Sequence, residues 1–131
     1  MQSIELAWAA GFYDGEGCTG VSTLRLRPGK GRSRMVLTME VNQVDERPLQ
    51  RFAAAVGCGS ITRRTAPRNA RWQQQSRWRA VGGTAELALV RLLPYLSEPK
   101  REQAERAIER AYAHYCMRTA VGAGTEAEAS A

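Results

Sequence analysis

The sequence is poor in histidine and cysteine, the side chains on which most zinc sites and disulfide frameworks depend. His114 is the single histidine, which argues against a histidine-ligated metal centre. The three cysteines, Cys18, Cys58 and Cys116, are an odd number and form no CxxC pair. We therefore expect reduced thiols in an intracellular protein, with neither a disulfide framework nor a zinc site.

Long apolar runs are also missing. The sequence has no secretory segment and no apolar stretch long enough to span a bilayer. We therefore expect a cytoplasmic protein without a membrane partner.

The chain is short and contains no internal repeat. Its 131 residues suffice for one hydrophobic core but not for two. We expect a single domain over residues 1–118. Residues 119–131 consist mainly of Ala, Gly, Glu, Ser and Thr, and we expect them to form a disordered tail.

The charge balance is basic, and arginine supplies nearly all of the excess. Lys and Arg together number 19 against 13 Asp and Glu, and Lys30 and Lys100 are the only lysines. The arginine guanidinium pairs bidentately with phosphates and with guanine edges, so this balance indicates a nucleic-acid partner. Arginine-rich codon usage in a GC-rich genome is an alternative explanation.

Hydrophobic periodicity divides the chain into alternating helices and strands. We expect helices over residues 3–13 and 45–56, a helix after Gly82-Gly83 with the apolar face Leu87, Val90 and Leu93, and a last helix from Pro99. We expect strands over residues 18–27, 34–42, 60–65 and 71–81, the first two joined by a turn at 28–31. This order predicts an α+β fold with one antiparallel four-stranded sheet.

The strand predicted at 34–42 has the clearest alternation. Its two sides are Met35, Leu37, Met39 and Val41, and Arg34, Val36, Thr38, Glu40 and Asn42. The first set would face the core and the second would face outward.

Residues 8–17, WAAGFYDGEG, place two acidic residues between glycines at the end of a small-residue helix. We expect Gly15 and Gly17 to end the helix and leave the Glu16 carboxylate uncovered. A carboxylate in that position can ligate a hard cation such as Mg²⁺. The alternative is a helix C-cap followed by an acidic turn without chemistry.

Residues 9–17 resemble the nine-residue signature of the LAGLIDADG homing endonucleases, especially its GF-[FVY]-DGEG form. Ala9 stands where leucine is usual, and Glu16 where many relatives have aspartate. Further similarity lies at residues 37–43 and 92–104, so the resemblance covers roughly residues 3–117.

The resemblance implies an αββαββα fold whose sheet is curved and whose N-terminal helix pairs with that of a second copy. The interface residues would be Leu6, Ala9, Ala10, Tyr13 and Asp14. The alternative is that in water such a stripe, residues 6, 9, 10 and 13, more often packs on its own core.

The implied function is a site-specific DNA endonuclease from an intron or another mobile element. It would cut both strands of a long pseudo-palindromic site as a homodimer, with Mg²⁺ or Mn²⁺ and no small-molecule cofactor. Glu16 and Gly17 would bind the metal. Gln43 would orient water, and Lys100, or alternatively Arg101, would lie near the scissile phosphate.

Sequence specificity would come from the open face of the sheet. The candidate DNA-binding residues are Ser22, Arg25, Arg34, Thr38, Glu40, Thr62, Arg64, Arg77 and Arg79. The first strand is ambiguous, because the family register turns Ser22 and Leu24 to DNA whereas polarity turns Thr23, Arg25 and Arg27 there.

Two other functions fit the same residues. One is a catalytically inactive DNA- or RNA-binding protein of the same fold, such as a regulator or an intron maturase. The other is a basic protein that coats nucleic acid without sequence preference.

Overall fold

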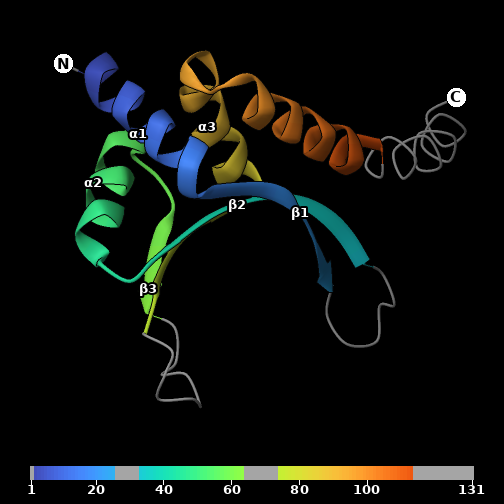
Figure 1. Ribbon diagram of the computed structural model, residues 1–131. Helices are drawn as coiled ribbons and strands as arrows, with labels where there is room; N and C mark the ends of the chain where they lie inside the picture. The colour runs from blue at the N-terminus through green and yellow to red at the C-terminus, as the bar shows by residue number, and fades with distance from the viewer. Residues whose placement is uncertain (1, 26–32, 64–73, 114–131) are drawn as a thin grey trace, which may run out of the picture.

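The computed structural model describes residues 2–25, 33–63 and 74–113, and these form helices and strands in the predicted order (Figure 1). The elements are α1 (Gln2–Glu16), β1 (Gly17–Arg25), β2 (Ser33–Gln43), α2 (Glu46–Val56), β3 (Ser60–Arg63), β4 (Ser76–Val81), α3 (Gly83–Leu92) and a 3₁₀ turn, η1 (Leu93–Tyr95). A last helix covers residues 98–113 and is called the C-terminal helix below.

The four strands form one antiparallel sheet in the order β1-β2-β4-β3. The sheet is curved, and the described helices all lie on one of its faces (Figure 1). The predicted αββαββα fold with a curved four-stranded sheet is therefore confirmed. The second face of the sheet has no described helix over it.

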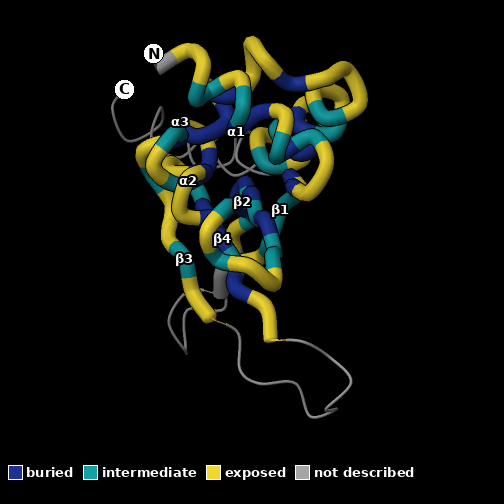
Figure 2. The backbone as a smooth tube through the Cα atoms, turned by 60° about the vertical axis from the view of Figure 1, so that its left-hand side comes forward, coloured by how far each residue is buried: buried dark blue, intermediate teal, exposed yellow. Residues whose placement is uncertain are grey.

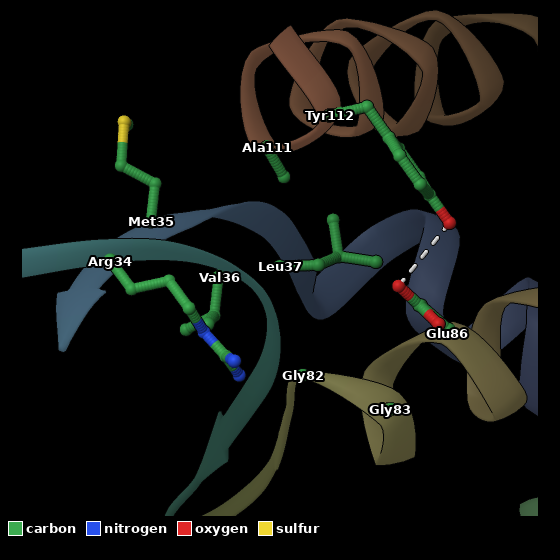
Figure 3. Close-up of a pocket in the computed structure, with 9 residues that line it drawn as sticks. All are labelled: Arg34, Met35, Val36, Leu37, Gly82, Gly83, Glu86, Ala111 and Tyr112. Carbon is green, nitrogen blue, oxygen red and sulfur yellow. Dashed lines mark hydrogen bonds between the residues drawn. The ribbon is translucent and has the colours of Figure 1, made fainter. Parts of the chain in front are cut away.

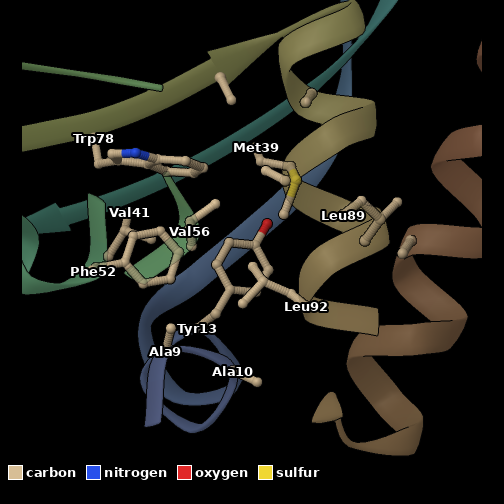
Figure 4. Packing of buried hydrophobic residues seen from close by; sticks show 14 of the residues in the cluster. Ala9, Ala10, Tyr13, Met39, Val41, Phe52, Val56, Trp78, Leu89 and Leu92 are labelled. Carbon is tan, nitrogen blue, oxygen red and sulfur yellow. The ribbon is translucent and has the colours of Figure 1, made fainter. Parts of the chain in front are cut away.

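The hydrophobic core fills the space between the helices and the covered face of the sheet (Figure 4). Phe52 of α2 meets Trp78 of β4 edge to face, with ring centroids 4.7 Å apart. From β2, Leu37, Met39 and Val41 are buried in this core, as their alternation predicts. The alternation is less clear at the start of the strand, where Met35 is only half-buried and Val36, predicted to face outward, is 5% exposed. Figure 2 shows buried residues concentrated where helices and strands meet, and exposed residues along β3 and the outer helical turns.

Helix α2 begins and ends where the sequence predicts. The Asp45 side chain accepts a hydrogen bond from the Arg47 amide at 3.0 Å and so caps the first turn. Gly57 ends the helix in the left-handed region at φ 79°, where glycine carries no steric penalty. Local chemistry is therefore sufficient to fix both of its ends.

Helix α1 is longer than predicted. It continues through Gly15 to Glu16, and β1 begins directly at Gly17. The prediction that the helix ends near residue 13 was wrong, because the single residue Gly15 does not break a helix that is packed along its length.

Helix α3 packs through a different face from the predicted one. Leu87, Val90 and Leu93 are 44%, 69% and 36% exposed, whereas Ala85, Ala88, Leu89 and Leu92 are buried. The small alanines let the helix lie close to the sheet, so the bulkier residues turn outward. The apolar face predicted for this helix was wrong.

Some predictions lie outside the described residues: the turn at 28–31, the strand ends at 26–27, 64–65 and 71–73, and the tail at 119–131. Within the described ranges, none of the helices combines the length and the apolarity that crossing a membrane requires.

Candidate active site

The junction between α1 and β1 places Glu16 at the surface and Gly17 in the interior. Glu16 is the last helical residue and is exposed, whereas Gly17 is buried. A Cβ atom at position 17 would overlap the ring of Tyr13, so only glycine lets the chain pass there. The reason for glycine is thus close packing, since Gly17 is not among the described residues with positive φ.

Lys100 reaches this junction from the C-terminal helix. Its side-chain nitrogen donates a hydrogen bond to the Gly17 carbonyl oxygen at 2.5 Å. The same nitrogen lies 6.0 Å from the centre of the Tyr13 ring. The fold therefore brings together Glu16, Gly17 and Lys100, three residues that the sequence analysis selected for one site.

Gln43 is the third predicted catalytic residue, and it ends β2 beside the junction. The pairing of β1 with β2 sets Val41 opposite Gly17. Gln43 lies two residues further along β2, a distance of about 7 Å along the strand. Its side chain is half-buried, and its own cross-strand partner is Ser76.

The junction offers hard oxygen atoms to a cation. The Glu16 carboxylate and the Gly17 carbonyl are donors of the type that Mg²⁺ prefers. The Lys100 ammonium on the Gly17 oxygen indicates that this carbonyl is open to a positive charge. Within the described part of the chain, no group of three or more His, Cys, Asp or Glu side chains could hold a metal ion. The donors fit a divalent ion, but one copy of the chain supplies only part of a complete ligand set.

Asp14 makes its contacts within its own chain. Its carboxylate accepts hydrogen bonds from the Ser97 amide at 3.1 and 3.2 Å and from the Ser97 hydroxyl at 3.0 Å. The carboxylate therefore holds the start of the C-terminal helix. The sequence prediction had assigned Asp14 to a dimer interface and did not include this contact.

Most of the predicted interface residues of α1 face the wrong way for an interface. Ala9, Ala10 and Tyr13 are fully buried in this chain's own core (Figure 4). Leu6 is half-buried against that core. Burial also raises the pKa of the Tyr13 hydroxyl, which shares a hydrogen bond of 2.5 Å with the Thr19 hydroxyl. The prediction that these three buried residues form a dimer interface was therefore wrong, because their side chains already pack within this chain.

The exposed side of α1 carries Ile4, Ala7, Gly11 and Gly15. A Cβ atom added at Gly11 or Gly15 would meet nothing within 4 Å, so this side is both open and narrow. The spacing of these residues by three and four places them together on one side of the helix.

The open face of the sheet carries most of the predicted DNA-binding residues. Strand pairing sets Glu40 opposite Arg79, and Arg77 opposite both Asn42 and Thr62. Thr38 follows the same alternation on β2. Arg77 Nη1 lies 3.7 Å from Glu40 Oε2. A hollow of about 550 Å³ lies here, lined in part by Thr62, Arg77 and Arg79.

Three polar atoms on this face are buried without a hydrogen-bond partner in the described structure: Asn42 Oδ1, Arg77 Nε and Arg79 Nε. Buried polar groups are usually paired, so these atoms mark a surface suited to a polar ligand.

The register of β1 resolves the ambiguity about its faces. Ser22 pairs with Val36, and Cys18 pairs with Glu40, so Ser22 belongs to the open face. Thr19 is of the opposite parity and is buried on the covered face. Arg25 pairs with Ser33 and also has this opposite parity, which disagrees with the assignment from polarity. The side chain of Arg25 and the whole of Arg64 lie outside the described part of the structure.

A second hollow, of about 330 Å³, lies between the start of β2, the start of α3 and the end of the C-terminal helix (Figure 3). Arg34, which is exposed, lines one side of it. Across it, the Tyr112 hydroxyl donates to Glu86 Oε1 at 3.4 Å. Arg34 is one of the predicted DNA-binding residues, but no pattern in the sequence indicates this hollow.

Comparison with known proteins gives one family and several solved structures. The model of the LAGLIDADG endonuclease family matches residues 9–78. No curated protein matches the sequence.

The homing endonuclease I-CvuI in complex with its target is similar over 89% of this chain and 71% of that one, with 26% identity and a TM-score of 0.67. I-CvuI in complex with the I-CreI target is 29% identical, with a TM-score of 0.62 over 79% of this chain. This chain covers 63% of that relative, less than two thirds of its length.

The group I intron-encoded homing endonuclease I-CeuI, complexed with DNA, has 15% identity and a TM-score of 0.63 over 85% of this chain and 53% of that chain. At that identity the likeness concerns the fold alone.

Proposed function

Because this chain belongs to the LAGLIDADG endonuclease family, we propose that it is a site-specific DNA endonuclease. It acts as a homodimer on a long pseudo-palindromic site and depends on a divalent metal ion, Mg²⁺ or Mn²⁺. The observation that carries this proposal is the contact of Lys100 with the Gly17 carbonyl. It sets a cationic side chain on the residue that follows the exposed Glu16, at the start of a strand of the open sheet face that bears arginines.

The Glu16 carboxylate and the Gly17 carbonyl oxygen would hold the metal ion. When bound, such an ion activates water and neutralises negative charge on the attacked phosphate. Glu16 supplies the negative charge, and Gly17 supplies a neutral oxygen that the backbone fixes in place.

Lys100 would bind the scissile phosphate. Its ammonium carries three donors on a flexible stem, so it can contact a phosphate oxygen while remaining close to Gly17. Gln43 would orient the attacking water, because its amide can both donate and accept.

The homodimer follows from the number of carboxylates. One Glu16 serves one strand of the duplex, so cutting both strands needs a second copy. Two α1 helices would meet through the exposed side that carries Ile4, Ala7, Gly11 and Gly15, whose small residues permit a close approach. A two-fold dimer matches a pseudo-palindromic site.

The open sheet face would read the bases. The proposed contacts on it are Ser22, Arg34, Thr38, Glu40, Thr62, Arg77 and Arg79, with Arg64 as a further candidate. Arg25 is not among them, because its register in β1 assigns it to the other face. The unpartnered Nε atoms of Arg77 and Arg79 support this assignment, since guanidinium groups pair with guanine edges and phosphates.

The proposal is tested with a plasmid library that carries randomised palindromes. Mg²⁺ should support cleavage of a selected site, and Ca²⁺ should support binding only. Glu16→Gln should bind the site without cutting it. Glu105→Gln, which changes an exposed acid of the C-terminal helix, should cut normally.

Wild-type protein that protects one site in a footprint but never nicks it would instead be an inactive regulator or maturase. Binding that weakens with salt and has no sequence preference would indicate a non-specific coat protein.

A further inference from the structure

One side of the C-terminal helix makes three consecutive contacts with the α1–β1 junction. Ser97, Lys100 and Gln103 are spaced by three residues and therefore lie on the same side of the helix. They contact Asp14, Gly17 and Thr19 respectively. We propose that Asp14 and Gln103 are positioning residues for Lys100. This inference rests on the proposed function, in which Lys100 binds the scissile phosphate.

Asp14 fixes the start of the helix. The Arg101 amide donates to the Ser97 carbonyl at 2.9 Å, which makes Ser97 the residue at which helical hydrogen bonding begins. The Ser97 amide and hydroxyl both donate to Asp14. Lys100 follows one turn later. By holding Ser97, the Asp14 carboxylate therefore fixes the position of the Lys100 backbone along the helix axis relative to the α1–β1 junction.

Gln103 fixes the rotation of the helix. Its Oε1 accepts a hydrogen bond from the Thr19 amide at 3.2 Å. Thr19 belongs to β1, which lies at the edge of the sheet and pairs with β2 alone. The amide therefore points away from the sheet, and Thr19 is buried, so Gln103 satisfies a donor that would otherwise be unpaired.

Lys100 lies between these two anchors. A lysine side chain has a long, flexible stem, and its ammonium explores a large volume unless the backbone beneath it is fixed. With Ser97 and Gln103 held, the Lys100 side chain extends past the Tyr13 ring, and its nitrogen reaches the Gly17 oxygen. Neither anchor has to touch DNA or metal to act in this way.

The lysine content of the chain gives a test that does not depend on activity. Lys30 and Lys100 are the only lysines, so the acylation rate of each is readily measured by mass spectrometry of the full-length protein after digestion. We expect Gln103→Met and Asp14→Ala to raise the acylation rate of Lys100, relative to that of Lys30, by about tenfold, as when a hydrogen bond to a charged group is lost.

Glu102→Met is the matched control, because Glu102 is exposed on the same helix. It should leave the ratio unchanged. Circular dichroism checks that each variant is folded, and Gln103→Met and Asp14→Ala test the two anchors independently. A Lys100 rate in both variants equal to that of Glu102→Met would overturn the proposal.

DNA cleavage provides a second test of the proposal that Asp14 and Gln103 position Lys100. In single-turnover assays, Gln103→Met should cut about tenfold or more slowly with unchanged affinity for DNA. In a Lys100→Met background it should cause no further loss, because both changes act on one group. A further loss of the same size would show a general structural role and contradict the inference. If wild-type protein fails to cut any site, the proposed function fails, while the acylation ratio still decides whether the anchors hold Lys100.

Discussion

The ring of Tyr13 occupies the space that a side chain at position 17 would need. A Cβ atom there would overlap several ring atoms of Tyr13, which is itself fully buried. Gly17 is therefore required by packing, and its carbonyl oxygen accepts the hydrogen bond from Lys100.

The first prediction concerns this contact. Gly17→Ala should lower the free energy of unfolding by about 1–3 kcal/mol, because a methyl group forces a buried ring to move. Urea denaturation measures the change. Gly20→Ala is the control in the same strand, since a Cβ atom at Gly20 meets nothing within 4 Å. Equal stability of the two variants would contradict the packing described here.

The second prediction tests which side of α3 is buried. Leu89→Ala should cost about 2–4 kcal/mol of unfolding free energy, because Leu89 is 3% exposed and its loss leaves a cavity. Leu87→Ala removes the same atoms from a side chain that is 44% exposed and should cost under about 1 kcal/mol. The reverse order would restore the face predicted from the sequence.

The third prediction tests the proposed homodimer. Gly11→Gln should convert a dimer to a monomer in analytical ultracentrifugation, because a long side chain would separate the two α1 helices. The monomer should unfold at the same or slightly higher denaturant concentration, since glycine weakens a helix interior by about 0.5–1 kcal/mol. Ala54→Gln, on the exposed side of α2, is the control and should stay dimeric. A Gly11→Gln protein that is still dimeric would place the interface elsewhere.

The fourth prediction concerns pH. Hydrogen bonds and charge from Arg47 lower the pKa of Asp45 from 3.8 to about 2. A carboxyl group with a lowered pKa stabilises the fold above its unfolded value and loses that contribution as the pH falls. Asp45→Asn keeps the capping oxygen but removes the charge. Its melting temperature should lie below that of the wild type at pH 7, and the two should converge between pH 4 and pH 2. A gap that persists at pH 2 would rule out the charge as its source.

The sequence was sufficient to predict the order of helices and strands, because their periodicities are local. It also predicted both ends of α2, where Asp45 and Gly57 act on their immediate neighbours. The inward positions of Leu37, Met39 and Val41 on β2 were predicted from alternation alone, which depends on no other element.

The errors arose where two sides of a helix look alike in the sequence. Helix α1 has small or apolar residues all round, so nothing local distinguishes the buried Ala9 and Ala10 from the exposed Ala7 and Gly11. In α3 the larger residue Leu87 suggested the core side, but the sheet accepts the smaller Ala85 and Ala88.

The contacts of Ser97 and Gln103 could not be predicted either. Asp14 and Ser97 are 83 residues apart, and Thr19 and Gln103 are 84 apart. The sequence shows only that Ser97, Lys100 and Gln103 are spaced by three residues. That spacing can be interpreted only when residues 14–19 are known to be their partners.

The single-sided arrangement of the helices has a consequence for how such a chain evolves. Thr38 and Arg79 belong to the uncovered face by the register of β2 and β4, and neither is part of the hydrophobic core on the other face. They can be exchanged freely while the opposite layer stays intact. A scaffold of this kind can acquire a new binding preference by successive single replacements, without passing through unfolded intermediates.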